Sequence, residues 1–247
     1  MRPAVAVVGA RAATPYALRV AFDVAHACAA AGVCVVSGLA RGVDAAAHEG
    51  ALAGGGSTIA VLGTGIDVVY PPEHAALYAA VRDQGTLVSM LPAGAPPRRG
   101  HFPARNRVLA ALSDGVVLVQ ADTSSGAHHT VRATLAGGAW VKVAPWPLDD
   151  ARFAGNAAWL ARRDARVTPL LDAADAARQA RRAADGAAAT TPAALLRAAL
   201  GAGASTLDEL ARRAGLDAAT AAVAALELEL AGEARRLPGD RYCRGAA

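Results

Sequence analysis

The sequence is poor in lysine, cysteine and aromatic residues. Lys142 is the only lysine among 247 residues, and Phe, Trp and Tyr together make up 4%. The three cysteines, Cys28, Cys34 and Cys243, form no CxxC pair, so no disulfide framework is indicated. Cys28 and Cys34 fall in apolar patterns, and we expect them to be buried free thiols. With so few aromatics, the core is expected to consist of Val, Leu, Ile and Ala, which favours a parallel sheet covered by helices.

The chain also lacks any apolar run of the ~18 to 20 residues that a membrane span requires. Its first residues, MRPAVAVVGAR, show no signal-peptide pattern, and we therefore expect a cytoplasmic protein without a membrane partner. Hydrophobic residues make up 54% and charged residues 19%, a composition that excludes disorder of the whole chain.

The formal net charge is +4, and nearly all of the positive charge is arginine. Arginine binds phosphate through a planar fork of donors, so this bias is compatible with a nucleic-acid partner. A chain encoded by GC-rich DNA would show the same bias. Composition alone therefore does not decide between the two explanations.

Short Val-rich segments alternate with helical patterns over the first 145 residues. This alternation predicts an α/β domain, a Rossmann-like, mostly parallel sheet with helices on both faces. In such sheets ligands bind at the carboxyl ends of the strands. The predicted strands cover residues 4–9, 33–38, 57–63, 86–91, 115–121 and 139–144.

The pattern changes after residue 171. Residues 172–192 are low in large apolar side chains and are predicted to be a linker between a core domain, 1–171, and a second domain, 193–247. Three short helices followed by the hairpin-like EARRLPGDRYCR predict a small C-terminal winged-helix domain. Its third helix carries no basic residue on its exposed face. A protein contact or dimer packing is therefore at least as well supported for this domain as binding in the DNA major groove.

Three loops at the predicted carboxyl edge carry residues suited to an anion. In GARAATPYA, Gly9 permits a tight turn and Arg11 stands beside the amino end of a helix. Ser37 and Gly38 end the second strand and offer a hydroxyl and close access to the backbone. The segment HFPARNR places two further arginines at the amino end of a predicted helix. Because adjacent loops on one edge converge, we expect a phosphate site, although a plain surface role for Arg11 stays open.

Catalytic patterns are missing. The sequence has no H-E-x-x-H, no G-x-S-x-G and no Walker A loop, and GTGIDVV lacks the third glycine of a dinucleotide fingerprint. His128 and His129 are neighbours, so in a helix they point about 100° apart and make a poor metal pair. They are predicted to be surface or groove residues. We expect no catalytic residue, no metal and no cofactor.

Five segments occur in an order that resembles the DNA-processing protein A family, called DprA or Smf. They are VVGARAATPYA, VVSGLARGVDAAAHEGAL, GGSTIAVLGTGIDVVYPPEH, FPARNRVLAALSDGVVLV and SSGAHHTVRATLAGG. The match covers roughly residues 5–145, and the tail from about 193 is similar to the winged-helix domain of many members. The resemblance implies a non-enzymatic, dimeric protein that binds single-stranded DNA. It also implies a recombination mediator that protects incoming single strands and loads RecA in natural transformation.

Carried over by motif, the resemblance assigns a set of residues to the DNA pocket. These nucleic-acid-binding residues are Arg11, Ser37, Gly38, Arg105, Asn106, Arg107, Ser125 and Gly126.

The sequence departs from the family pattern at several positions, which marks a divergent member. Ser124 stands where a basic residue is usual, Met90 where an acidic one is usual, and Gln120 where a glutamate is usual. His128 and His129 replace a hydrophobic pair. The N-terminal helical domain of many members is not expected in this chain.

Two other functions remain open. Related Rossmann-like enzymes hydrolyse the N-glycosidic bond of nucleoside monophosphates and carry a P-G-G-x-G-T-x-x-E loop. The nearest segment here, AGGGSTIA, precedes a strand and has no glutamate. The other alternative is a winged-helix regulator with a degenerate sensor domain.

Overall fold

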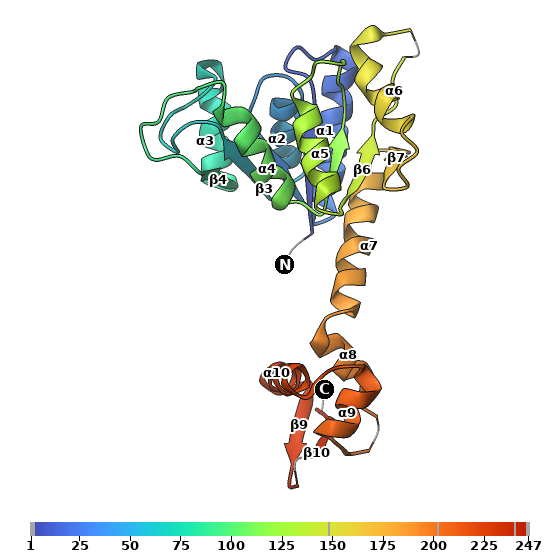
Figure 1. Ribbon diagram of the computed structural model, residues 1–247. Coiled ribbons are helices and arrows are strands. Elements are labelled where there is room, and N and C mark those ends of the chain that lie inside the picture. Colours follow the sequence, from blue (N-terminus) through green and yellow to red (C-terminus); the bar gives the residue numbers. More distant parts are fainter. Residues whose placement is uncertain (1–2, 148, 202, 240, 246–247) are drawn as a thin grey trace. The chain divides into compact units, whose positions relative to one another are not determined.

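The computed structural model describes residues 3–147, 149–201, 203–239 and 241–245 (Figure 1). The chain divides into two compact units, Met1–Ala183 and Ala184–Ala247. Within the described residues, no helix has the length and apolar character needed to span a membrane.

The first unit is built on a seven-stranded sheet in which every pairing is parallel. The strands follow the order β4-β3-β2-β1-β5-β6-β7. Chain order reverses between β1 and β5, so the loops after these two strands leave in different directions and open a crevice. The predicted parallel sheet is confirmed. The strand bounds are β1 Ala4–Val8, β2 Cys34–Ser37, β3 Thr58–Leu62, β4 Thr86–Ser89, β5 Gly115–Leu118, β6 Trp140–Val143 and β7 Val167–Pro169.

Helices cover both faces of this sheet. Val5 and Val7 of β1 pack on one face against α1 (Pro15–Ala30) and α2 (Val43–Ala53). The alternate residues of β1 belong to the core of the other face, together with side chains from α4 (His101–Ala111), α5 (Ala127–Ala136) and α6 (Ala154–Leu160). Figure 1 shows α4 and α5 side by side in front of the sheet. The remaining helices are α3 Ala75–Gln84 and the 3-10 turns η1 Pro72–His74 and η2 Ala151–Phe153.

The helix α7 (Asp175–Ala189) covers most of the predicted linker. Its residues Ala176, Ala177 and Ala180 are buried on the α1 side of the sheet. At its first turn, the Asp175 carboxylate lies 3.1 Å from the Lys142 ammonium of β6, and both side chains are about 10% exposed. The first unit therefore extends to Ala183 instead of ending at residue 171. Alanine carries this packing, which is why the low content of large apolar residues resembled a linker.

The second unit has its own core around Leu196, Leu210, Leu228 and Tyr242. Three helices and a three-stranded sheet of order β8-β10-β9 form the predicted winged helix. A capping box is present, because Thr206 and Glu209 exchange side chain–backbone hydrogen bonds. The elements are α8 Pro192–Ala199, β8 Ser205–Thr206, α9 Leu207–Ala214, α10 Ala218–Leu230, β9 Ala234–Leu237 and β10 Arg241–Arg244.

Cys28 and Cys34 are free and buried, as predicted. Burial raises the pKa of the Cys28 thiol to about 12. This thiol therefore acts as a small apolar residue of the core.

Candidate functional site

A pocket of about 480 Å³ opens in the crevice at the carboxyl ends of β1 and β5. We call it the β1–β5 pocket. It is formed by the loops after these strands, by α4 and the first turn of α5, and by single residues of the loop after β2, of α2 and of η2. Its lining includes Arg11, Asp44, Phe102, Arg105, Asn106, Gln120, Asp122, Ser125, Gly126 and His129.

The structure brings five of the predicted site residues to this pocket and leaves three outside its lining. Those in the lining are Arg11, Arg105, Asn106, Ser125 and Gly126. Gly38 lines a small neighbouring pocket that it shares with Arg11, and Arg107 lines another one between α4 and α5.

Ser37 is fully buried. Its hydroxyl donates a hydrogen bond of 2.7 Å to the carbonyl of Val7 and so ties β2 to β1. A hydroxyl that is already bonded and has no exposed surface cannot also bind a ligand in this structure.

Arg105 is buried, with 4% of its surface exposed. Its guanidinium donates to the carbonyls of Gly38 and Val61 and, at 3.1 Å, to the side-chain oxygen of Asn106. Desolvation lowers the pKa of Arg105, and the nearby Asp44 carboxylate opposes that shift. Arg105 therefore joins the loop after β2 and the strand β3 to α4, and most of its donors are used inside the protein.

Asp44, in the first turn of α2, is the buried counter-charge of Arg105. Its carboxylate accepts hydrogen bonds from the backbone N–H groups of Gly38 at 3.1 Å and Ala40 at 3.4 Å. Burial raises the pKa of Asp44, while Arg105 and then the two backbone donors act in the opposite direction. The pair holds the loop after β2 against the floor of the pocket, which is a structural role for both side chains.

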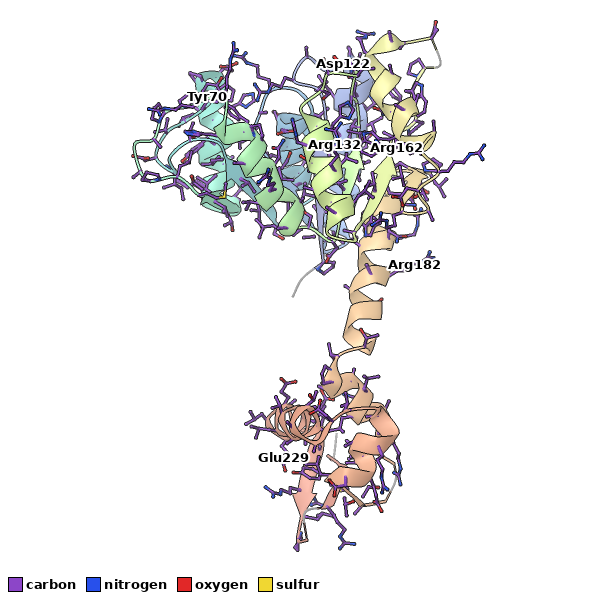
Figure 2. All side chains as sticks on the ribbon, in the orientation of Figure 1. Tyr70, Asp122, Arg132, Arg162, Arg182 and Glu229 are labelled. Atoms are coloured by element: carbon purple, nitrogen blue, oxygen red, sulfur yellow. The ribbon has the colours of Figure 1, made fainter. Side chains whose placement is uncertain are left out.

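Arg11 is the exposed cation of the pocket. Its guanidinium carbon lies 4.9 Å from the ring centroid of Phe102, within the range of a cation–π contact. The ring of Tyr70 lies 5.8 Å from that of Phe102, and Figure 2 labels this tyrosine. Arg11, Phe102 and Tyr70 all line the small neighbouring pocket, where planar groups can stack on flat bases and the arginine can bind phosphate.

Phe102 and Tyr70 were not among the residues predicted for the site. Phe102 lies in the segment HFPARNR, three positions before Arg105. An aromatic residue beside a run of cations is a signal for single-stranded nucleic acid, and it could have identified Phe102. Nothing in the sequence around Tyr70 indicates that its ring meets Phe102.

The amino end of α5 forms one wall of the pocket. Gly126 is the N-cap residue and provides no side-chain cap, while the Ser125 hydroxyl accepts from the Ala127 N–H at 3.3 Å. Asn106 donates to the carbonyl of Gly126 at 3.4 Å and joins α4 to this wall. The N–H groups of Ala127, His128 and His129 are bonded to Ser125 and Gly126, so this wall favours an anion through the helix dipole.

Ser124 is tied to its own loop. Its backbone N–H and its hydroxyl both donate to the carboxylate of Asp122, at 2.7 and 2.9 Å. The position where a basic residue is usual in the family pattern thus carries no charge and no free hydroxyl proton. Cations for a ligand in this region must come from other elements.

The two neighbouring histidines have different environments. His128 is buried, and its Nδ1 accepts a hydrogen bond of 2.9 Å from the indole N–H of Trp159. Since indole can only donate, the proton of His128 is on Nε2, which donates to the carbonyl of Asp122 at 2.7 Å. The prediction of a surface position is wrong for His128, because α6 covers it. His129 is exposed and lines the pocket.

Gln120, in place of the usual glutamate, fixes the start of α1. Its side-chain oxygen accepts from the backbone N–H of Thr14 at 2.9 Å and from the Thr14 hydroxyl at 3.3 Å. Thr14 is the N-cap of α1, and its hydroxyl oxygen accepts from the N–H of Ala17. A neutral amide here leaves the pocket with one carboxylate fewer than a glutamate would, which favours an anionic ligand.

The glycine run before β3 lies at the opposite edge of the sheet from the pocket. Gly54 ends α2, and Gly56 packs against Ala29 of α1. A phosphate-binding loop of a nucleoside monophosphate hydrolase would have to stand at the carboxyl edge. Within the described residues, no cluster of three or more His, Cys, Asp or Glu side chains could hold a metal ion.

Comparison with known proteins gives consistent matches over both units. The family model for DNA recombination-mediator protein A matches residues 1–180, and the model for the DprA winged helix domain matches residues 179–240. Protein Smf of Synechocystis is 43% identical over 130 residues, which are 53% of this chain and 33% of that relative. The chain thus spans about a third of the length of this curated relative.

Two solved structures are similar to most of this chain. The DNA processing protein A of Streptococcus pneumoniae gives a TM-score of 0.65 at 34% identity, covering 70% of this chain and 60% of that one. The structure of DNA processing protein A of Helicobacter pylori concerns its single-stranded DNA binding mode. It gives a TM-score of 0.64 at 28% identity and covers 73% of this chain and 80% of that one. With the family models, these matches show that the chain belongs to the DNA recombination-mediator protein A (DprA) family.

Proposed function

We propose that this chain binds single-stranded DNA at the β1–β5 pocket. The observation that carries the proposal is the exposed Arg11 stacked on Phe102, beside the amino end of α5. The arginine can bind phosphates with help from the helix dipole, while the aromatic rings offer flat surfaces to bases of any identity. The Helicobacter pylori relative is described as binding single-stranded DNA, which supports the same ligand class.

The pocket favours a single strand over a duplex for a geometrical reason. Phe102 and Tyr70 can stack only on bases whose faces are free. In a duplex the base faces are covered by their neighbours, and exposing one costs unstacking energy of a few kcal/mol. A single strand can place its bases against Phe102 and Tyr70 and its phosphates against Arg11 at the same time.

We extend the proposal to the role that the family description names, recombination mediation. The chain would protect incoming single strands and load RecA onto them in natural transformation, and no catalytic residue is needed for that. Mixing RecA with oligo-dT in the presence and absence of the chain tests the RecA contact. Faster or more complete coverage by RecA supports it, and an unchanged or slower rate contradicts it.

We also propose that the chain acts as a homodimer. Leu171, at the end of β7, is 75% exposed, the largest fraction among the large apolar side chains described in the first unit. Exposing an apolar side chain of this size is unfavourable in a monomer, and a second copy that covers it would remove that cost.

The winged helix gives little support to a duplex-reading regulator. Its third helix, α10, contains no lysine or arginine and exposes Val223, Leu226 and Leu230. A helix that enters the major groove contacts phosphates on both sides and needs cations near them. The apolar face of α10 fits a protein contact better.

One binding experiment tests the central proposal. Labelled oligo-dT and a duplex of equal length are titrated with the protein at low salt, each with the other as unlabelled competitor. We expect tighter binding of the single strand and poor competition by the duplex. Equal affinity for both would contradict the proposal, and release of a free base from a nucleoside monophosphate would point to the hydrolase instead.

A further inference from the structure

We infer that a second phosphate-binding position, resting on the proposed function, lies between α4 and α5. It is a pocket of about 320 Å³ lined by Pro103, Arg107, His129, Arg132 and Ala133, which we call the α4–α5 pocket. Two arginines and a histidine from two adjacent helices converge on this space. Their chemistry fits the phosphodiester of a strand whose first part occupies the β1–β5 pocket.

The two pockets are adjacent, because Pro103 and His129 line both of them. A strand that leaves the β1–β5 pocket past His129 meets Arg107 from α4 and Arg132 from α5. Figure 2 labels Arg132 on α5, the helix that lies beside α4.

Both arginines are free to bind an external anion. Neither Arg107 nor Arg132 has an ion pair or hydrogen bond with any part of the chain that the structure describes. Five other exposed arginines of the first unit are paired with carboxylates. Such pairs are Arg41 with Glu73, Arg82 with Asp83, Arg152 with Asp150, Arg166 with Asp164 and Arg178 with Asp172.

The α4–α5 pocket also supplies the cations for phosphate that the β1–β5 pocket has few of. Ser124 is uncharged and bound to Asp122, and the guanidinium of Arg105 is occupied by backbone carbonyls. Arg11 is then the only arginine in the β1–β5 lining that is both exposed and without a carboxylate partner among the described residues. Further phosphates of a longer strand therefore depend on the cations of the α4–α5 pocket.

The test compares oligo-dT of about 4 nucleotides, which fills the first pocket, with oligo-dT of about 20 nucleotides. The double variant Arg107→Ala/Arg132→Ala is expected to lose about tenfold in affinity for the longer strand and little for the shorter one. For the longer strand, the slope of the logarithm of affinity against the logarithm of salt concentration (the salt slope) is expected to become shallower by about 1.4, because two phosphate contacts are lost. Arg82→Ala, which removes an exposed arginine on α3, is the matched control.

A gain-of-function variant keeps the test independent of any loss by misfolding. His129→Arg places a permanent cation where both pockets meet, and we expect it to bind the longer strand more tightly than the unmodified chain. If the unmodified chain prefers the single strand but neither variant differs from Arg82→Ala, the second position is refuted and the proposed function stands. If the unmodified chain shows no preference, the proposed function itself fails.

Discussion

The guanidinium of Arg105 lies directly on the backbone of Gly38 and donates to its carbonyl. A Cβ atom at residue 38 would overlap the guanidinium nitrogens, so the glycine is required by this approach. The two residues are 67 positions apart in the sequence and belong to the loop after β2 and to α4. Their contact sets the shape of the pocket floor, and Arg105 therefore acts on DNA binding through structure.

Replacing either residue should lower stability as well as affinity. Arg105→Ala leaves the carbonyls of Gly38 and Val61 without donors and Asp44 without its counter-charge, at an expected cost of about 3 kcal/mol. Gly38→Ala should cost about 2 kcal/mol by overpacking. Denaturant unfolding checks both values. An Arg105→Ala variant of unchanged stability with reduced DNA affinity would instead make this arginine a direct phosphate contact.

Phe102 is expected to contribute stacking and no charge. Phe102→Leu should weaken oligo-dT binding about tenfold or more, since base–aromatic stacking contributes about 1 to 3 kcal/mol per base. The salt slope should stay unchanged, because no phosphate contact is lost. Phe22→Leu, which shortens a half-buried aromatic in α1, is the control. An equal loss in both variants would show a general packing effect.

His48 should make the fold sensitive to acid. Its Nδ1 donates to the hydroxyl of Thr58, whose own proton goes to the carbonyl of Val35. Its Nε2 is buried without a partner among the described residues. Burial, and to a lesser degree the charges of Arg105 and His74, lowers the pKa of His48 to about 3.

The direction of the pH effect follows from this lowered pKa. Between about pH 6.5 and pH 3 the unfolded chain binds the proton of His48 and the folded chain does not, so stability falls as pH falls. From pH 6.5 to 4.5 the expected loss is at most about 3 kcal/mol. His48→Asn, which keeps a donor toward Thr58, should flatten the dependence. Equal slopes of unfolding free energy against pH for both proteins would contradict this assignment.

Leu171 should lie in the homodimer interface. Leu171→Arg is expected to convert a dimer into a monomer, because a charge in an apolar contact would be desolvated without a partner. Sedimentation velocity measures the change, with Leu112→Arg at the end of α4 as a control of similar chemistry. A dimer that persists in Leu171→Arg but dissociates in Leu112→Arg would place the interface on the other helix layer.

Much of the fold could be predicted from the sequence because local patterns determine it. Val-rich strands alternating with helices predicted the parallel sheet, and three short helices followed by a hairpin-like segment predicted the winged helix. The convergence of Arg11 with Asn106 and Gly126 followed from topology, since parallel strands end at one edge.

Side-chain partners far away in the sequence could not be predicted. Arg105 resembles a ligand-binding residue in the sequence, but its partners are backbone carbonyls, which carry no sequence signal. Trp159 follows His128 by 31 positions and covers it, and no local sequence pattern predicts that contact. Alanines in α7 pack as tightly as large residues do, so their burial was not visible in composition.

The salt dependence of oligo-dT binding, compared between the unmodified chain, Arg11→Ala and Arg82→Ala, tests the central claim most directly. Arg11 is exposed and has no carboxylate partner among the described residues, whereas Arg82 is paired with Asp83 in α3. The account predicts a slope reduced by about 0.7 and an affinity lowered about tenfold at low salt in Arg11→Ala alone. Identical slopes and affinities in all three proteins would contradict phosphate binding at the β1–β5 pocket.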